Sequence, residues 1–189
     1  MEQHFFDTVE SSPIIAAVKD KKGLDQCCGL PDIKIIFILY GDVCSIADIV
    51  NQIRDAGKMA IVHVDLVTGL ASKEIAVDFI KKYTGADGII STKPGMIKRA
   101  KELNMLTVMR FWMLDSISLE TVGKQLALVK PDFIEILPGI MPKIIKRISS
   151  QFRIPVIAGG LIQDKEDVVA VLNAGAISVS TTNPNVWLM

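Results

Sequence analysis

Short runs of β-branched and other apolar residues recur along the whole chain, and segments with a helical pattern separate them. Most of these runs are continuously apolar, which is typical of strands that are buried on both faces of a parallel sheet. The sequence therefore predicts eight strands, at residues 14–18, 34–39, 59–65, 88–91, 106–110, 133–137, 156–159 and 177–181.

The intervening segments carry apolar residues at helical spacing. They predict helices at residues 46–56, 73–83, 94–103, 119–129, 142–151 and 165–173. Pro94 and Pro142 suit a first helical turn, and Asp164 with Asp167 is typical of a helix N-terminus. Strands alternating with helices indicate an α/β fold, a compact TIM-type (β/α)8 barrel with a parallel sheet and short loops. An open doubly wound sheet is the alternative, although its Gly-rich fingerprint after the first strand is missing.

One phrase occurs twice, in residues 85–95 and 175–185: Gly-Ala, a strand, two hydroxyl residues, a polar residue and then Pro. The two copies fall at the fourth and eighth strands, which are equivalent positions of two half-barrels. With 189 residues, the chain is short for this fold. We expect one barrel domain over residues 1–189, with residues 2–10 covering its bottom and the connection 19–32 too short for a long helix.

Composition sets the broad class of the protein. Half of the residues are apolar and the mean hydropathy is +0.39, yet the longest apolar run covers only residues 35–40. A membrane span needs roughly 18 such residues, so no membrane partner is expected. The acidic N-terminus does not resemble a secretory signal, and three cysteines without C-x-x-C spacing favour neither a disulfide framework nor a zinc site. We predict a cytoplasmic protein.

The charge is balanced overall but unevenly distributed. Twenty-one basic and 21 acidic side chains give a formal net charge of +0, whereas residues 93–153 hold eleven basic and five acidic side chains, a net charge of +6. If the helices of this segment lie side by side, their outer faces form one basic surface. The candidate basic face consists of Lys98, Arg99, Lys101, Lys143, Lys146 and Arg147; the alternative is an ordinary solvated face.

Binding sites of this fold lie at the carboxyl ends of the strands. There the seventh strand gives Gly159 and Gly160, and the eighth gives Ser180 and Thr181. Adjacent glycines let the backbone approach a ligand, and the hydroxyl groups add donors, so these four residues predict a phosphate site. The alternative is a tight turn followed by helix-capping hydroxyl groups.

A second polar set lies at the ends of the third to sixth strands: His63, Asp65, Lys93, Arg110 and Glu135. If Glu135 points into the barrel, its charge needs a partner, and we expect Arg110 or Lys93. The set suits a small anionic ligand, or else forms a structural ion-pair network. No catalytic constellation is evident, and two histidines in the whole chain make a His-rich metal site improbable. We therefore predict no metal.

Several of these strand-end segments together resemble one known family. They are residues 63–69 (His-Val-Asp-Leu-Val-Thr-Gly), 133–139 (Phe-Ile-Glu-Ile-Leu-Pro-Gly) and 154–162 (Ile-Pro-Val-Ile-Ala-Gly-Gly-Leu-Ile). The sequence is similar to the glycerol-3-phosphate-responsive transcription antiterminators that regulate the glycerol uptake operon of Gram-positive bacteria. The similarity spans nearly the whole chain.

The resemblance implies a regulator that binds glycerol 3-phosphate as its effector, without a cofactor, and then binds the leader mRNA of a glycerol operon. Gly159, Gly160, Ser180 and Thr181 would hold the phosphate, and Asp65, Lys93, Arg110 and Glu135 would be candidates around the glycerol end. No RNA-binding module is evident in the sequence, so RNA would contact the barrel surface, including the basic helices or a homodimer of them. A small phosphate-ester-handling barrel enzyme and a ligand-binding barrel with a protein partner are the competing hypotheses.

Overall fold

The strands form a closed parallel barrel. The computed structural model of the protein describes residues 2–189, and for residues 2–4 and 10 only the backbone. Within that range the strands are β1 (Ile14–Val18), β2 (Ile35–Ile38), β3 (Met59–His63), β4 (Gly88–Ser91), β5 (Leu106–Trp112), β6 (Phe133–Leu137), β7 (Val156–Gly159) and β8 (Ser178–Thr181). Each strand pairs in parallel with the next one, and β8 pairs with β1 through the register Ile14 to Val179. The predicted barrel is confirmed, and the open sheet is excluded.

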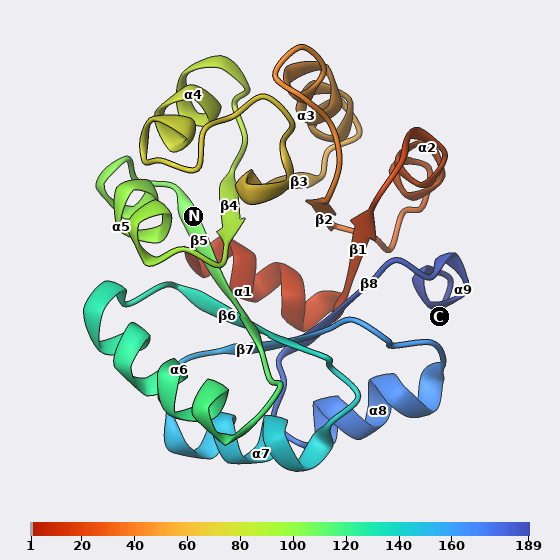
Figure 1. Ribbon diagram of the computed structural model, residues 1–189. Helices are drawn as coiled ribbons and strands as arrows, with labels where there is room; N and C mark the ends of the chain where they lie inside the picture. Colours follow the sequence, from red (N-terminus) through yellow and green to blue (C-terminus); the bar gives the residue numbers. More distant parts are fainter. Residues whose placement is uncertain (1) are drawn as a thin grey trace.

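Helices surround the barrel on its outside (Figure 1). They are α2 (Lys21–Cys28), α3 (Ile46–Asp55), α4 (Ile75–Tyr83), α5 (Pro94–Glu102), α6 (Ser116–Val129), α7 (Pro142–Gln151), α8 (Lys165–Asn173) and the short α9 (Pro184–Trp187). One 3-10 turn, Val64–Leu66, follows β3, so the strand is shorter than the predicted range 59–65. None of the described helices is long and apolar enough to cross a membrane.

Two helix starts differ from the sequence prediction, those of α4, which begins at Ile75 rather than at 73, and of α6, whereas the connection 19–32 holds no long helix, as expected. Helix α6 begins at Ser116 rather than at 119, because the Asp115 carboxylate accepts the Ser118 backbone N–H and so acts as the N-cap. The connection after β1 holds the eight-residue helix α2, whose Asp20 N-cap accepts the N–H of Gly23. Short polar caps of this kind let a helix form where the loop is brief.

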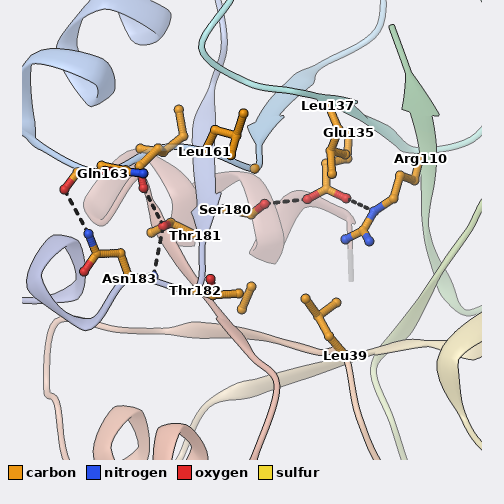
Figure 2. Close-up of a pocket in the computed structure, with 13 residues that line it drawn as sticks. Leu39, Arg110, Glu135, Leu137, Leu161, Gln163, Ser180, Thr181, Thr182 and Asn183 are labelled. Atoms are coloured by element: carbon orange, nitrogen blue, oxygen red, sulfur yellow. Dashed lines mark hydrogen bonds and ion pairs between the residues drawn. The ribbon is translucent and has the colours of Figure 1, made fainter. Parts of the chain in front are cut away.

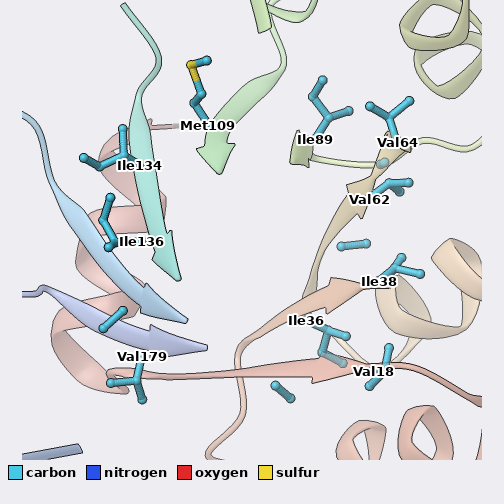
Figure 3. Packing of buried hydrophobic residues seen from close by; sticks show 14 of the residues in the cluster. Val18, Ile36, Ile38, Val62, Val64, Ile89, Met109, Ile134, Ile136 and Val179 are labelled. Carbon is cyan, nitrogen blue, oxygen red and sulfur yellow. The ribbon is translucent and has the colours of Figure 1, made fainter. Parts of the chain in front are cut away.

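The apolar core has two layers. Alternate strand residues point outward and pack under the helices, and Figure 3 shows part of this layer, including Val18, Ile36, Val62 and Ile136. The other strand residues fill the barrel interior, where they include Ile15, Phe37, Ile61 and Phe133. This double burial is why the strands are apolar throughout their length.

Helix α1 (Glu2–Ser11) closes the end of the barrel from which the strands start. Its Phe5 is fully buried and lies 4.3 Å from Phe133, ring centroid to ring centroid, and Val9 is buried in the same interior cluster. The expectation that residues 2–10 cover the bottom of the barrel is confirmed. The opposite end, where the strands finish, remains open for a site.

Candidate functional site

A cavity of about 450 Å³ opens at the carboxyl ends of β7 and β8. Figure 2 shows polar side chains from β5, β6, β8 and the loops after β7 and β8 around it. The lining residues are Ala17, Leu39, Arg110, Glu135, Leu137, Gly160, Leu161, Ile162, Gln163, Ser180, Thr181, Thr182 and Asn183. Five of the eight predicted ligand residues line this cavity (Gly160, Ser180, Thr181, Arg110 and Glu135), whereas Gly159, Asp65 and Lys93 do not.

The loop after β7 turns its backbone toward the cavity. Gly160 and Leu161 adopt consecutive left-handed conformations, with φ of +77° and +62°. Glycine adopts this conformation readily, whereas leucine rarely does. The backbone N–H groups of Leu161, Ile162 and Thr182 donate to no acceptor among the described residues. Successive free N–H groups in such a turn form a concave site that suits an anion.

The hydroxyl groups that the sequence suggests as phosphate donors already have partners. Ser180 Oγ donates to Glu135 Oε1, and Thr181 Oγ1 donates to the Ile162 carbonyl over 2.8 Å. Thr181 Oγ1 also accepts the Asn183 N–H at 3.1 Å. These two side chains therefore shape the loops around the cavity, while the backbone provides the free donors.

Gly159 does not line the cavity but allows three strands to approach one another. A Cβ atom at this position would lie 2.5 Å from Glu135 Oε1 and 2.8 Å from Ser180 Oγ. Only glycine leaves room for the carboxylate there. Gly159 therefore allows close packing of the strands, whereas the glycine that lines the cavity is Gly160.

Glu135 points into the barrel, and its charge is paired. Its side chain is fully buried, Arg110 Nε donates to Oε2 and Ser180 Oγ donates to Oε1. Arg110 is only 7% exposed. A buried carboxylate is tolerated only with such partners, so Arg110, and not Lys93, is the partner that the sequence left open.

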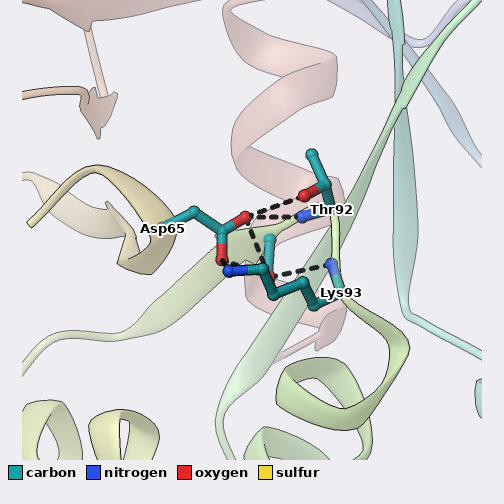
Figure 4. Close-up of polar contacts among 4 residues, drawn as sticks. Asp65, Thr92 and Lys93 are labelled. Atoms are coloured by element: carbon teal, nitrogen blue, oxygen red, sulfur yellow. Dashed lines mark hydrogen bonds and ion pairs between the residues drawn. The ribbon is translucent and has the colours of Figure 1, made fainter. Parts of the chain in front are cut away.

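Asp65 and Lys93 lie together at the ends of β3 and β4, outside this cavity (Figure 4). Asp65 accepts hydrogen bonds from Ser91 Oγ at 2.9 Å and from the Thr92 N–H at 2.8 Å, and Lys93 Nζ lies 3.7 Å from its carboxylate. The carboxylate thereby fixes the turn that leads into α5. The structure thus places the two residues in a separate polar cluster.

His63 is buried at the end of β3, where the charges of Arg110 and Asp65 act on it. Burial and, to a smaller extent, the Arg110 charge lower its pKa from 6.5 to about 4, and the Asp65 charge opposes them. Its Nδ1 has no hydrogen-bond partner in the part of the chain that the structure describes. Within that part there is also no cluster of three or more metal-ligating His, Cys, Asp or Glu side chains.

The candidate basic face is divided by α6. Lys98, Arg99 and Lys101 lie on α5, whereas Lys143, Lys146 and Arg147 lie on α7. Arg99 is paired with Asp78 and Glu102, and Lys101 with Asp132. The cations of α7 are exposed.

Fold and site together define a small (β/α)8 barrel with a polar pocket at the carboxyl ends of its last two strands. A sequence model described as the glycerol-3-phosphate responsive antiterminator matches residues 14–187. The chain belongs to this family, as its strand-end segments led us to expect.

Similar proteins agree with this assignment. The uncharacterized protein YgcP of Escherichia coli (strain K12) is 44% identical over 181 residues, which cover 96% of this chain and 94% of YgcP. The crystal structure of the glycerol uptake operon antiterminator regulatory protein from Listeria monocytogenes has a TM-score of 0.89 at 36% identity, with 93% and 94% of the two chains covered. A glycerol uptake operon antiterminator-related protein from Thermotoga maritima gives 0.83 at 32% identity, with 94% and 99% covered.

More distant structures share the fold alone. Orotidine 5'-phosphate decarboxylase from Pyrococcus horikoshii matches with a TM-score of 0.69 at 19% identity, over 92% of this chain and 94% of its own. Barrels of this shape therefore include enzymes, and the shape by itself does not decide the activity.

Proposed function

We propose that this protein is a cytoplasmic regulator that binds glycerol 3-phosphate in the cavity at β7 and β8 and, in that state, binds the leader mRNA of a glycerol operon. It acts without a cofactor and without turnover of the ligand. Membership of the antiterminator family supports the regulatory role. The pocket supports the choice of a phosphate ester as the ligand.

The observation that carries the proposal is the set of unpaired backbone N–H groups. Leu161, Ile162 and Thr182 come from two different loops and line one cavity. An unpaired N–H at the edge of a cavity is satisfied well by a phosphate oxygen, because the charge of the oxygen strengthens the hydrogen bond. The phosphate group is therefore proposed to lie between these two loops, beside Gly160.

The glycerol end of the ligand is proposed to face the buried ion pair. Arg110, Glu135 and Ser180 line the same cavity, and their remaining donor and acceptor positions suit hydroxyl groups. Asp65 and Lys93, at the neighbouring strand ends, are proposed to contribute to the electrostatic field on that side. The cavity is large enough for a ligand with a three-carbon backbone.

An enzymatic role on a phosphate ester is the alternative that the fold allows. Both carboxylate oxygens of Glu135 accept hydrogen bonds, from Arg110 and from Ser180. These hydrogen bonds hold the carboxylate in place, and the described cavity lining contains no other Asp, Glu, His or Lys side chain that could act as a general acid or base beside it. This arrangement favours ligand binding over proton transfer.

The function is tested by RNA binding with and without the effector. Fluorescence anisotropy on leader transcripts of the host's glycerol genes should show that saturating glycerol 3-phosphate raises the affinity by about 5- to 150-fold, the usual range of allosteric coupling. Glycerol and inorganic phosphate serve as control ligands. Unchanged affinity would contradict the proposal, and conversion of glycerol 3-phosphate to product would support the enzyme instead.

A further inference from the structure

Helices α6 and α7 leave two separate hollows between them on the outer wall of the barrel. The hollows lie along the line of contact of the two helices, of about 270 Å³ near the start of both helices and about 620 Å³ near their ends. Figure 1 shows the two helices next to each other on one side of the molecule. We refer to the two hollows together as the α6–α7 groove; it is lined by Leu119, Gly123, Leu126, Lys130, Met141, Ile144, Arg147, Gln151, Phe152 and Arg153, among others.

Cations without partners lie along the groove. Lys130 and Arg153 line the larger hollow and Arg147 the smaller one, and all three are exposed. None of the three forms an ion pair within the described residues. Unpaired cations attract a polyanion. They disfavour an apolar partner without negative charge, because its binding would bury the cations without a counter-charge.

The acidic side chains of the groove are already engaged. Asp132 accepts hydrogen bonds from the Thr107 N–H and hydroxyl group and pairs with Lys101 at 2.8 Å. Asp115 caps α6 by accepting from Ser118. The remaining charge of the groove is therefore positive.

The floor of the groove is apolar and includes one aromatic ring. Phe152 is half-buried in the larger hollow beside Leu126 and Ile154. Opposite it stands Gly123, and a Cβ atom there would lie 3.2 Å from Phe152 Cε1. A glycine in a helix interior is unfavourable by roughly 1 kcal/mol relative to alanine, and here it lets one part of the ring pack against α6 while the ring, which is only half-buried, still lines the hollow.

Helix α6 buries little of its surface against the barrel. Of its residues only Val122 is fully buried, while Ile117 and Leu128 are 71% and 75% exposed. An apolar helix that a barrel does not cover is a typical interaction surface. The groove beside it therefore combines free cations from α7 and from the residues after both helices, the Phe152 ring and apolar walls.

From this combination we infer that the α6–α7 groove binds single-stranded RNA, with Lys130, Arg147 and Arg153 on phosphates and a base against Phe152. Single strands expose flat bases that stack on aromatic side chains, while cations follow their backbone. This inference rests on the proposed function. It narrows the RNA-binding surface, because it assigns RNA binding to the cations of the groove and not to the other cations of α7.

The test uses two matched triple variants of the full chain. The groove variant is Lys130→Gln, Arg147→Gln and Arg153→Gln, and the control is Lys98→Gln, Lys143→Gln and Lys146→Gln. Both remove three exposed positive charges, and the control residues do not line the groove. Thermal unfolding checks that both variants are folded.

The readout is the affinity for leader transcripts of the host's glycerol genes, in the presence of glycerol 3-phosphate, as a function of salt concentration. The groove variant should bind about tenfold more weakly or worse, and its slope of log K against log salt should fall by about 2, since each lost phosphate contact accounts for about 0.7. The control variant should stay within about threefold of the wild type. Phe152→Leu should lose about fivefold in affinity at an unchanged slope, because only stacking is removed.

The outcomes separate the two proposals. Equal losses in both triple variants, or a loss in the control alone, would overturn the groove while leaving RNA binding intact. An unchanged RNA affinity with a changed oligomeric state would make the groove a protein interface and would also overturn it. If the wild-type protein binds none of the transcripts, the proposed function itself fails.

Discussion

At the scale of single residues, the open end of the barrel is organised by buried charge. Glu135 lies inside the barrel because Arg110 and Ser180 satisfy both of its oxygens and Gly159 leaves the space that a side chain would occupy. Removal of one partner from such a pair typically costs about 3–5 kcal/mol, since the other charge is left buried alone. The ion pair therefore fixes the relative positions of β5, β6 and β8 around the cavity.

The buried imidazole of His63 makes stability depend on pH. Its pKa in the folded protein is about 4, below the 6.5 of the exposed side chain, so the unfolded chain takes up the proton first as the pH falls. Stability should therefore decrease from about pH 6.5 downward and level off below about pH 4. Between about pH 7.5 and pH 5, the loss due to His63 should be about 2 kcal/mol.

The matched variant is His63→Asn, which retains a polar side chain but does not titrate in this range. Urea unfolding at several pH values measures both proteins, and the difference between them isolates the contribution of His63. If the two proteins lose stability in parallel between pH 7.5 and pH 5, the imidazole is not held neutral in the folded state.

At the scale of elements, helix α1 contributes buried side chains to the core inside the barrel. The interior at the starting end of the strands is filled by Phe5 and Val9 of this helix together with Phe133 of β6. The bottom of the barrel is thereby covered, and the cavity beside β7 and β8 opens at the opposite end. The helix thus helps to determine at which end a ligand can enter.

Truncation of Phe5 tests this role of α1. Phe5→Ala should lower the free energy of unfolding by about 3–5 kcal/mol, because it removes a fully buried ring and leaves a void beside Phe133. Ile75→Ala, at a position that is 65% exposed, should change stability by no more than about 0.5 kcal/mol. Chemical denaturation of both variants gives the comparison, and similar small losses would show that α1 is not part of the core.

The sequence was informative about elements for a physical reason. Continuous β-branched runs are typical of strands that are buried on both faces, and the strands were predicted with small errors at their ends. The start of α6 was misplaced because Asp115 and Ser118 are both good N-caps, and only the structure shows which one accepts a hydrogen bond.

The candidate site was less accessible to sequence reasoning. Side-chain chemistry pointed to Ser180 and Thr181, whose hydroxyl groups have internal partners, whereas the free donors are backbone N–H groups of Leu161, Ile162 and Thr182. A backbone donor has no signature in the residue type, and a leucine gives no hint of a left-handed conformation. The neighbouring Gly160 was the only available signal.

At the scale of the whole molecule, closure of the barrel assembles the cavity. The pairing of β8 with β1 places Ala17 and Leu39 on the wall opposite the loops after β7 and β8. Residues from both ends of the chain are thus brought to one pocket, while the α6–α7 groove lies on the outer wall. Effector and RNA therefore occupy separate surfaces in the function that we propose.

The most direct test of this account is isothermal titration calorimetry with glycerol 3-phosphate, glycerol and inorganic phosphate. The wild-type protein should bind glycerol 3-phosphate at least about tenfold more tightly than either fragment, which corresponds to about 1.4 kcal/mol. Ala17→Leu, which extends a side chain of the cavity wall, should abolish binding, whereas Ala71→Leu on an exposed loop should not. If the wild-type protein does not bind glycerol 3-phosphate, or if Ala17→Leu binds it as tightly as the wild type does, the assignment of this cavity as the effector site is contradicted.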